Sequence, residues 1–167
     1  YEINNFLKIY KNIKITFFCT GIIAKQLPDL ISKISKDGHE IACHYYYHDE
    51  MNKQSFKEVE KYSLLAKETL EVVSNSEVIG FRAPKFKIDK DNPEQYKVIA
   101  KLFKYDSSWF GNNINDLKRF LVKMDLINFS IFPIYSDKFF PFMPPFKIGG
   151  SYLKLFSKSV SSTLIEK

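Results

Sequence analysis

The sequence is poor in the residues that mark several common kinds of protein. Its 167 residues include two cysteines, one tryptophan, three histidines and two arginines, and it has no run of eighteen or more apolar residues. Two cysteines cannot form the framework of a disulfide-rich fold. The lack of a long apolar run predicts no transmembrane segment. The opening residues, with acidic Glu2 after Tyr1, also lack the pattern of a signal peptide.

The charge is positive, but its distribution argues against nucleic-acid binding. The formal net charge is +6, and lysine supplies nearly all of the positive charge. A nucleic-acid interface would cluster arginine and lysine with stacking aromatic residues. The two arginines, Arg82 and Arg119, lie outside basic clusters. We therefore predict solvated lysines and no nucleic-acid partner, and an acidic polysaccharide is compatible with the charge.

The two cysteines lie in apolar segments. Cys19 and Cys43 each end a stretch that is typical of a strand. Buried free thiols are therefore predicted. Free thiols favour a reducing compartment such as the cytoplasm.

Hydrophobic periodicity indicates strands that alternate with helices. This pattern predicts an α/β fold with a mainly parallel sheet. The length predicts one domain over 1–167, and prolines and phenylalanines over 133–156 predict a long aromatic loop within it. Strands are expected at 13–19, 40–43, 78–81, 105–108 and 126–132, and helices at 1–10, 22–36, 55–73, 92–103, 115–123 and 152–156.

Two histidines directly follow the predicted strand at 40–43. His44 and His48 are four residues apart, so a helical turn would place both on one face. Two imidazoles can hold one zinc-like ion, and α/β folds place their sites at the carboxyl ends of parallel strands. The alternative is two partly exposed histidines beside an aromatic surface. His39 does not fit the metalloprotease spacing and is expected to be structural.

A second candidate segment follows the strand at 78–81. Arg82 can bind a carboxylate through two hydrogen bonds, Pro84 stiffens the loop, and Phe86 is placed to face a ligand. The alternative is a surface arginine and a turn proline.

A third candidate segment contains the only tryptophan. Trp109 follows Asp106 closely, and an aromatic ring can pack against the apolar face of a sugar. Core packing is the alternative for Trp109.

Together these segments resemble the NodB-homology polysaccharide deacetylases, carbohydrate esterase family four. The resemblance is carried by four family motifs, and two further segments resemble a branch from exopolysaccharide gene clusters. The segments are 14–21 (KITFFCTG, like ATFFvxG), 37–44 (DGHEIACH, like GHEIxxH), 81–84 (FRAP, like RxP), 106–109 (DSSW), and, for the branch, 128–133 and 149–153.

The resemblance implies a partial, distorted (β/α) barrel that hydrolyses an acetyl group, usually N-acetyl, on a glycan. It implies a divalent metal, most often zinc, with His44 and His48 as ligands beside an aspartate. Arg82 would orient the general base, an aspartate, and a late histidine would be the acid. The backbone N–H of Lys85 would stabilise the oxyanion. Substrate contacts would come from Pro84, Phe86, Asp106 and Trp109.

Several family features are missing from this sequence. There is no Asp-Asp pair for the base and third ligand, and no histidine follows His48. Tyr45 stands where the family often has a small residue, and Ser108 stands where an acidic residue is common. We expect a sequence truncated at both ends, which by itself is inactive.

Two other functions remain open at this stage. One is a catalytically inactive carbohydrate-binding relic of the same fold. The other is a hydrolase of non-glycan amides, of the ureide type. An upstream Asp-Asp pair after an apolar strand would favour an enzyme. Localisation also stays open, because many relatives act at the cell envelope.

Overall fold

The centre of the molecule is a five-stranded parallel sheet. The computed structural model describes residues 13–89, 91, 93–109 and 113–134, and the backbone of 136–137 and 146–147. The strands lie side by side in chain order, as in a (β/α) barrel. They are β1 (Thr16–Cys19), β2 (Glu40–Cys43), β3 (Gly80–Phe81), β4 (Tyr105–Asp106) and β5 (Ser130–Ile131).

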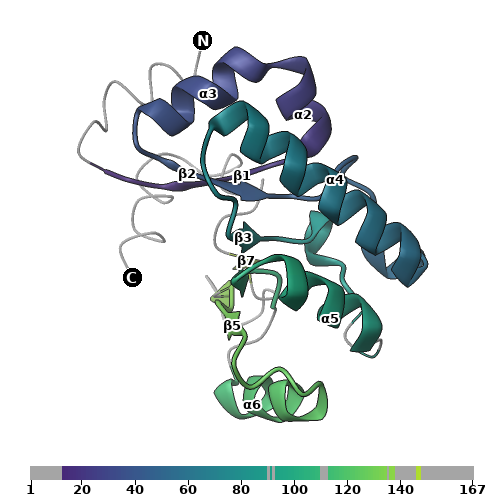
Figure 1. Cartoon of the computed structure of the whole chain (residues 1–167). Coiled ribbons are helices and arrows are strands. Elements are labelled where there is room, and N and C mark those ends of the chain that lie inside the picture. The colour runs from purple at the N-terminus through teal and green to yellow at the C-terminus, as the bar shows by residue number, and fades with distance from the viewer. Residues whose placement is uncertain are drawn as a thin grey trace.

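Helices connect the strands and cover one face of the sheet. Figure 1 shows α2 (Gly21–Gln26), α3 (Pro28–Lys36) and α4 (Phe56–Ser74) on the same side of β1 and β2, and α5 (Pro93–Leu102) packs against β4. The parallel strands, crossover helices and strand order confirm the α/β class and form part of a (β/α) barrel. The helices are α2 (Gly21–Gln26), α3 (Pro28–Lys36), α4 (Phe56–Ser74), α5 (Pro93–Leu102) and α6 (Ile114–Lys123), with short 3-10 turns η1 (Met51–Lys53) and η2 (Pro84–Phe86).

The helix expected over 22–36 is divided in two. Leu27 has φ −130° and ψ 56°, and Pro28 begins α3. A proline disfavours helical geometry in the residue before it and has no N–H to continue the helix. The prediction of one continuous helix was wrong because the apolar period runs across the break.

Other expected elements are found with small differences. Ser55 caps α4 through a capping box with Glu58, which explains the sharp start of this helix. The loop expected over 133–156 contains two short antiparallel strands, β6 (Ser136–Asp137) and β7 (Phe146–Lys147). The helices expected at 1–10 and 152–156 lie outside the described residues.

Alternation along β2 divides its side chains between two faces. Ile41 and Cys43 are buried in the core that the helices cover. Because successive strand residues point to opposite faces, Glu40, Ala42 and His44 belong to the inner face. The inner face therefore carries the polar side chains of this strand and of the residue that follows it.

The two thiols are free, as predicted, but only Cys43 is fully buried, and Cys19 is partly buried. Cys19 on β1 and Cys43 on β2 are register partners in the sheet. Burial raises the pKa of Cys19 to about 11 and that of Cys43 to about 12. Both thiols are protonated at neutral pH and are poor nucleophiles.

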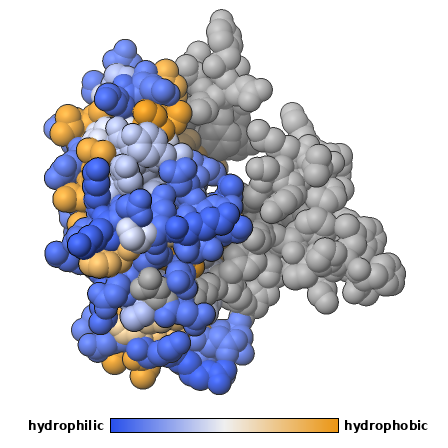
Figure 2. All heavy atoms as spheres, turned by 90° about the vertical axis from the view of Figure 1, so that its right-hand side faces the viewer, coloured by the Kyte–Doolittle hydropathy of each residue, from blue (hydrophilic) through white to orange (hydrophobic). Residues whose placement is uncertain are grey.

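One face of the described part of the molecule is mainly hydrophilic. Figure 2 shows the face on the right of Figure 1, where small apolar groups lie among hydrophilic ones. In the described part of the chain, no helix has both the length and the apolar character that a membrane crossing requires.

A tyrosine crosses the inner face over a glycine. The hydroxyl of Tyr105 on β4 donates to Glu40 Oε1 on β2 at 2.9 Å, and Thr16 Oγ1 on β1 donates to Glu40 Oε2 at 2.5 Å. Gly80 on β3 lies between them, and a Cβ there would overlap the Tyr105 ring and hydroxyl. The missing side chain at Gly80 therefore makes this polar connection across four strands possible.

We expect the substitution Gly80→Ala to destabilise the fold by about 1–3 kcal/mol, because the added methyl overpacks against Tyr105. Urea denaturation of the variant measures this loss. In a Tyr105→Ala background the same substitution should cost less than about 0.5 kcal/mol, since the clash is gone. An equal cost in both backgrounds would contradict the steric explanation.

Candidate active site

The loop after β2 brings the two predicted metal ligands together. The rings of His44 and His48 have centroids 4.9 Å apart and lie edge to face. The segment is not helical, because Tyr45 has φ 66° and His48 has φ 69°. The helical turn that would place both rings on one face is therefore absent, and the two rings lie together through a different backbone geometry.

Backbone hydrogen bonds from the start of α2 hold this loop. The N–H of Gly21 donates to the carbonyl of Tyr45 at 3.0 Å, and that of Ile22 to Tyr46 at 3.1 Å. A Cβ on Gly21 would overlap the Tyr46 ring. The first N–H groups of a helix have no partner inside it, so here they fix the left-handed backbone that turns the loop back.

His44 is held in a state suited to binding a cation. Its Nδ1 lies 2.7 Å from the carbonyl oxygen of Arg82, which can only accept, so Nδ1 carries the proton and Nε2 keeps its lone pair. Burial lowers the pKa of His44 to about 4, and the ring is neutral at neutral pH. A histidine ligand anchored through its other nitrogen is typical of metal sites.

The two imidazoles fit as part of a donor set. Within the described ranges, no group of three His, Cys, Asp or Glu side chains is arranged to hold a metal ion. His39 lies at the other end of β2, where its ring contacts Phe17 and its Nδ1 accepts the N–H of Ile15. Its role there is structural.

Arg82 lies on the inner face beside His44. Its Nη2 donates to Ser107 Oγ at 2.8 Å, its Nε donates to the Ser107 carbonyl at 3.2 Å, and its guanidinium lies 4.0 Å from the centre of the Phe18 ring. Burial lowers its pKa, and the charge of Asp106 partly opposes this. Among the described residues no carboxylate forms an ion pair with Arg82, so its predicted partner is not identified.

The loop after β3 has a constrained backbone. Pro84 is buried, while Lys85 and Phe86 have φ of 53° and 58°. Such conformations are costly for residues with a side chain and often occur at functional sites. Within the described structure no acceptor bonds the N–H of Lys85. Phe86 is half-buried, with the Arg82 guanidinium 5.8 Å from its ring centre.

Asp106 and Trp109 lie in the interior. Asp106 is fully buried and accepts from Ser108 Oγ at 2.5 Å, and burial raises its pKa to about 6. The Trp109 ring packs on Phe120 with centroids 4.8 Å apart. The structure thus does not bring these two side chains to the surface near the histidines. Their contact with a sugar stays a prediction.

Ser108 has a role that the sequence did not suggest. Its hydroxyl bonds Asp106 and also accepts the N–H of Ala83 at 2.7 Å. Through Ser108 the buried carboxylate supports the backbone between Arg82 and Pro84. No periodic signal in the sequence marks the serine as a bridge.

Glu50 joins the two site loops, and sequence reasoning missed it. Its carboxylate forms ion pairs with Lys53 at 2.8 Å, Lys85 at 3.1 Å and Lys87 at 3.2 Å. Hydrogen bonds from these lysines lower its pKa to about 2. Lys53 is three residues from Glu50, but Lys85 and Lys87 are distant in sequence, so no local pattern predicts the cluster.

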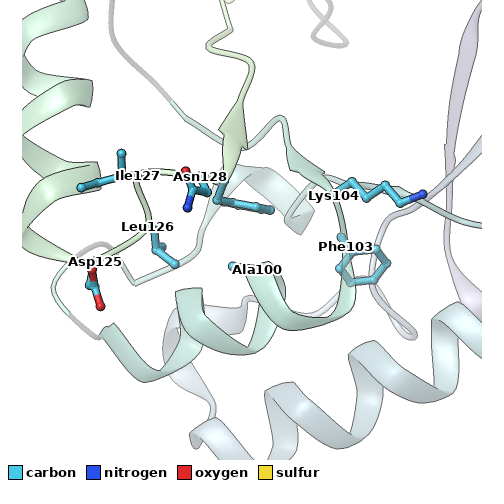
Figure 3. A pocket seen from close by; sticks show the side chains of 8 residues that line it. Ala100, Phe103, Lys104, Asp125, Leu126, Ile127 and Asn128 are labelled. Atoms are coloured by element: carbon cyan, nitrogen blue, oxygen red, sulfur yellow. The ribbon is translucent and has the colours of Figure 1, made fainter.

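A separate cavity of about 550 Å³ lies between α5 and the segment before β5. Phe103 and Leu126 form part of its wall, and Lys104 and Asp125 carry the charged groups (Figure 3). It shares no residue with the histidine pair and is not the candidate active site.

Comparison with family models assigns the chain to a known family. The sequence model of the polysaccharide deacetylase family matches residues 2–102, more than half of the chain. The chain therefore belongs to the polysaccharide deacetylase family. Comparison with curated proteins gives no match.

Solved structures share the fold. A protein from Mycobacterium smegmatis, provisionally assigned as a polysaccharide deacetylase, is 32% identical with TM-score 0.57, over 64% of this chain and 36% of that one. A family 4 carbohydrate esterase pseudoenzyme from Bacillus anthracis is 22% identical with TM-score 0.58, over 78% and 47%. The peptidoglycan deacetylase PdaC from Bacillus subtilis is 23% identical with TM-score 0.55, over 80% and 66%. The chain thus spans about a third to two thirds of these structures.

The Glu50 ion pairs predict a pH dependence of stability. The folded-state pKa of about 2 lies below the ordinary value of 4.5, so the stabilisation is present above pH 4.5 and is lost as the pH falls towards 2. Glu50→Gln should be less stable than the parent near pH 7, and the difference should shrink near pH 3. Urea denaturation at both pH values measures it.

Glu68→Gln is the matched control, because Glu68 is exposed on α4 and forms no ion pair within the described structure. Its difference from the parent should be small at both pH values. A Glu50→Gln deficit that is constant with pH would show that the carboxylate charge is not the cause.

Proposed function

We propose that the protein containing this chain is a metal-dependent hydrolase that removes N-acetyl groups from a polysaccharide or other glycan. Its family membership supports deacetylation. The observation that carries the metal dependence is the His44–His48 pair, with His44 neutral and anchored through Nδ1 to the Arg82 carbonyl.

His44 and His48 would hold the metal through ring nitrogens. A divalent ion such as zinc supplies Lewis-acid polarisation of the acetyl carbonyl when bound. The hydrogen bond to Arg82 keeps the His44 ring in one tautomer and one orientation. A third protein ligand, which the family resemblance assigns to an aspartate, would complete the donor set.

The neighbouring loop would serve the acetyl group. In the hydrolysis, water adds to the carbonyl carbon, the C–N bond breaks, and the amine leaves with a proton as acetate forms. The Lys85 N–H would donate to the oxygen that gains negative charge. Pro84 and Phe86 would form a wall beside the sugar. Arg82, held by Ser107 and Phe18, would orient a general base.

An inactive carbohydrate-binding relic is the second candidate. One similar structure is a pseudoenzyme, and a mutant of it has restored activity. The described residues also hold no third metal ligand. Metal binding and acetate release distinguish the two functions.

We expect the full-length gene product to bind zinc in a 1:1 ratio, and His44→Ala or His48→Ala to weaken binding at least about 100-fold, since a ligand is removed. Metal analysis and competition with a chelating dye measure this. His39→Gln is the matched control and should retain zinc, because His39 faces Phe17 at the other end of β2.

The 167-residue chain is measured in parallel, with acetate release from N-acetylated glycans as the second readout. Zinc lost only in the His44 and His48 variants, together with acetate release by the full-length protein, would establish the deacetylase. Absence of zinc and acetate release with glycan binding intact would leave the inactive relic.

A further inference from the structure

Four side chains form a cationic cluster beside the candidate active site. The Glu50 lysine cluster consists of Glu50, Lys53, Lys85 and Lys87, with all three ammonium groups within 3.2 Å of one carboxylate. Lysine amines are point charges that turn freely towards anions. Three ammonium groups that share the carboxylate of Glu50 still have most of their N–H donors available for other acceptors.

The cluster is built from two loops that are tied to each other. The N–H of Asn52 donates to the Lys87 carbonyl at 3.2 Å. The Glu50 side chain is only 15% exposed, whereas the three lysine side chains are 50–72% exposed. The carboxylate therefore lies underneath, and the ammonium groups form the surface.

The local charge is positive after Glu50 is counted. Three lysines and one carboxylate leave a net charge of +2. Asp49 is adjacent to Glu50 in sequence, and its charge also raises the pKa of Tyr45, after the larger effect of burial. No ion pair within the described structure joins Asp49 to these lysines.

The cluster lies next to the histidine pair along both loops. Glu50 is two residues beyond His48, so their Cα atoms are at most about 7 Å apart. Lys85 is three residues beyond Arg82, whose carbonyl anchors His44. Neighbouring units of one glycan chain could therefore contact the histidines and the lysines together.

We propose that the Glu50 lysine cluster binds a carboxylate on a sugar unit near the acetylated one, so that the preferred substrate is an acidic, uronate-containing glycan. The cluster already holds one carboxylate, that of Glu50, and has charge to hold a second. The inference that the cluster selects a substrate rests on the proposed deacetylase function. The binding test itself does not depend on catalysis.

The test compares two polymers that differ only in charge. Hyaluronan oligosaccharides carry N-acetyl groups and uronate carboxylates, and carboxyl-reduced hyaluronan is the neutral match. The full-length protein should bind the acidic form roughly tenfold more tightly at low salt. The preference should fall towards unity at about 0.5 M salt, where the charges are screened.

A pair of variants locates the effect. Lys53→Gln with Lys87→Gln should abolish most of the preference, while Lys85 and both histidines stay unchanged. The control, Lys101→Gln with Lys104→Gln, removes the same charge from lysines that pair with Glu60 and Glu77. It should keep the preference, and circular dichroism checks that both variants are folded.

Equal binding of the two polymers by the parent protein would overturn the inference. An equal loss of preference in both double variants would also overturn it, because the overall charge would then be the cause. A preference that survives without any acetate release would support the subsite while the proposed deacetylase fails.

Discussion

The hydrogen bond between His44 Nδ1 and the Arg82 carbonyl joins two neighbouring parallel strands at their carboxyl ends. It is a side-chain to backbone bond at 2.7 Å, and it sets the tautomer of the His44 ring. It also gives a hydrogen-bond partner to the carbonyl of Arg82, which lies just beyond the end of β3. Both loops of the candidate site start from this point. The strands β2 and β3 end just before it, and the two loops that follow them have left-handed residues at four positions: Tyr45, His48, Lys85 and Phe86.

The local order of strands and helices could be predicted from the sequence because hydrophobic period and end signals agree. Ser55 and Glu58 mark the start of α4, and Gly38, with φ 81°, ends the turn after α3. The break between α2 and α3 at Pro28 was the exception. The apolar residues keep a helical period on both sides of Pro28, so the period does not indicate that the helix is divided. The strands were also shorter than expected, because hydrogen-bonded pairing with a neighbouring strand, rather than composition, decides where a strand ends.

The candidate site was less predictable, for a physical reason. The proximity of His44 and His48 was expected from helical spacing, but the structure achieves it through positive φ angles and bonds from the start of α2. The role of Glu50 depends on pairs between two loops, and that of Ser108 on a bridge to Ala83. Such contacts join distant segments and leave no period in the sequence.

The crossing of Tyr105 over Gly80 has a consequence for how this sheet can evolve. Position 80 is restricted to glycine only while a large ring lies above it, and Glu40 Oε1 accepts a hydrogen bond from β4 only while that ring ends in a hydroxyl. The three positions lie on three different strands but form one steric and polar unit. Among relatives with the same sheet register, we expect them to change together: a smaller residue at 105 would allow a side chain at 80 and would leave an acid at 40 with the hydroxyl of Thr16 as its remaining donor.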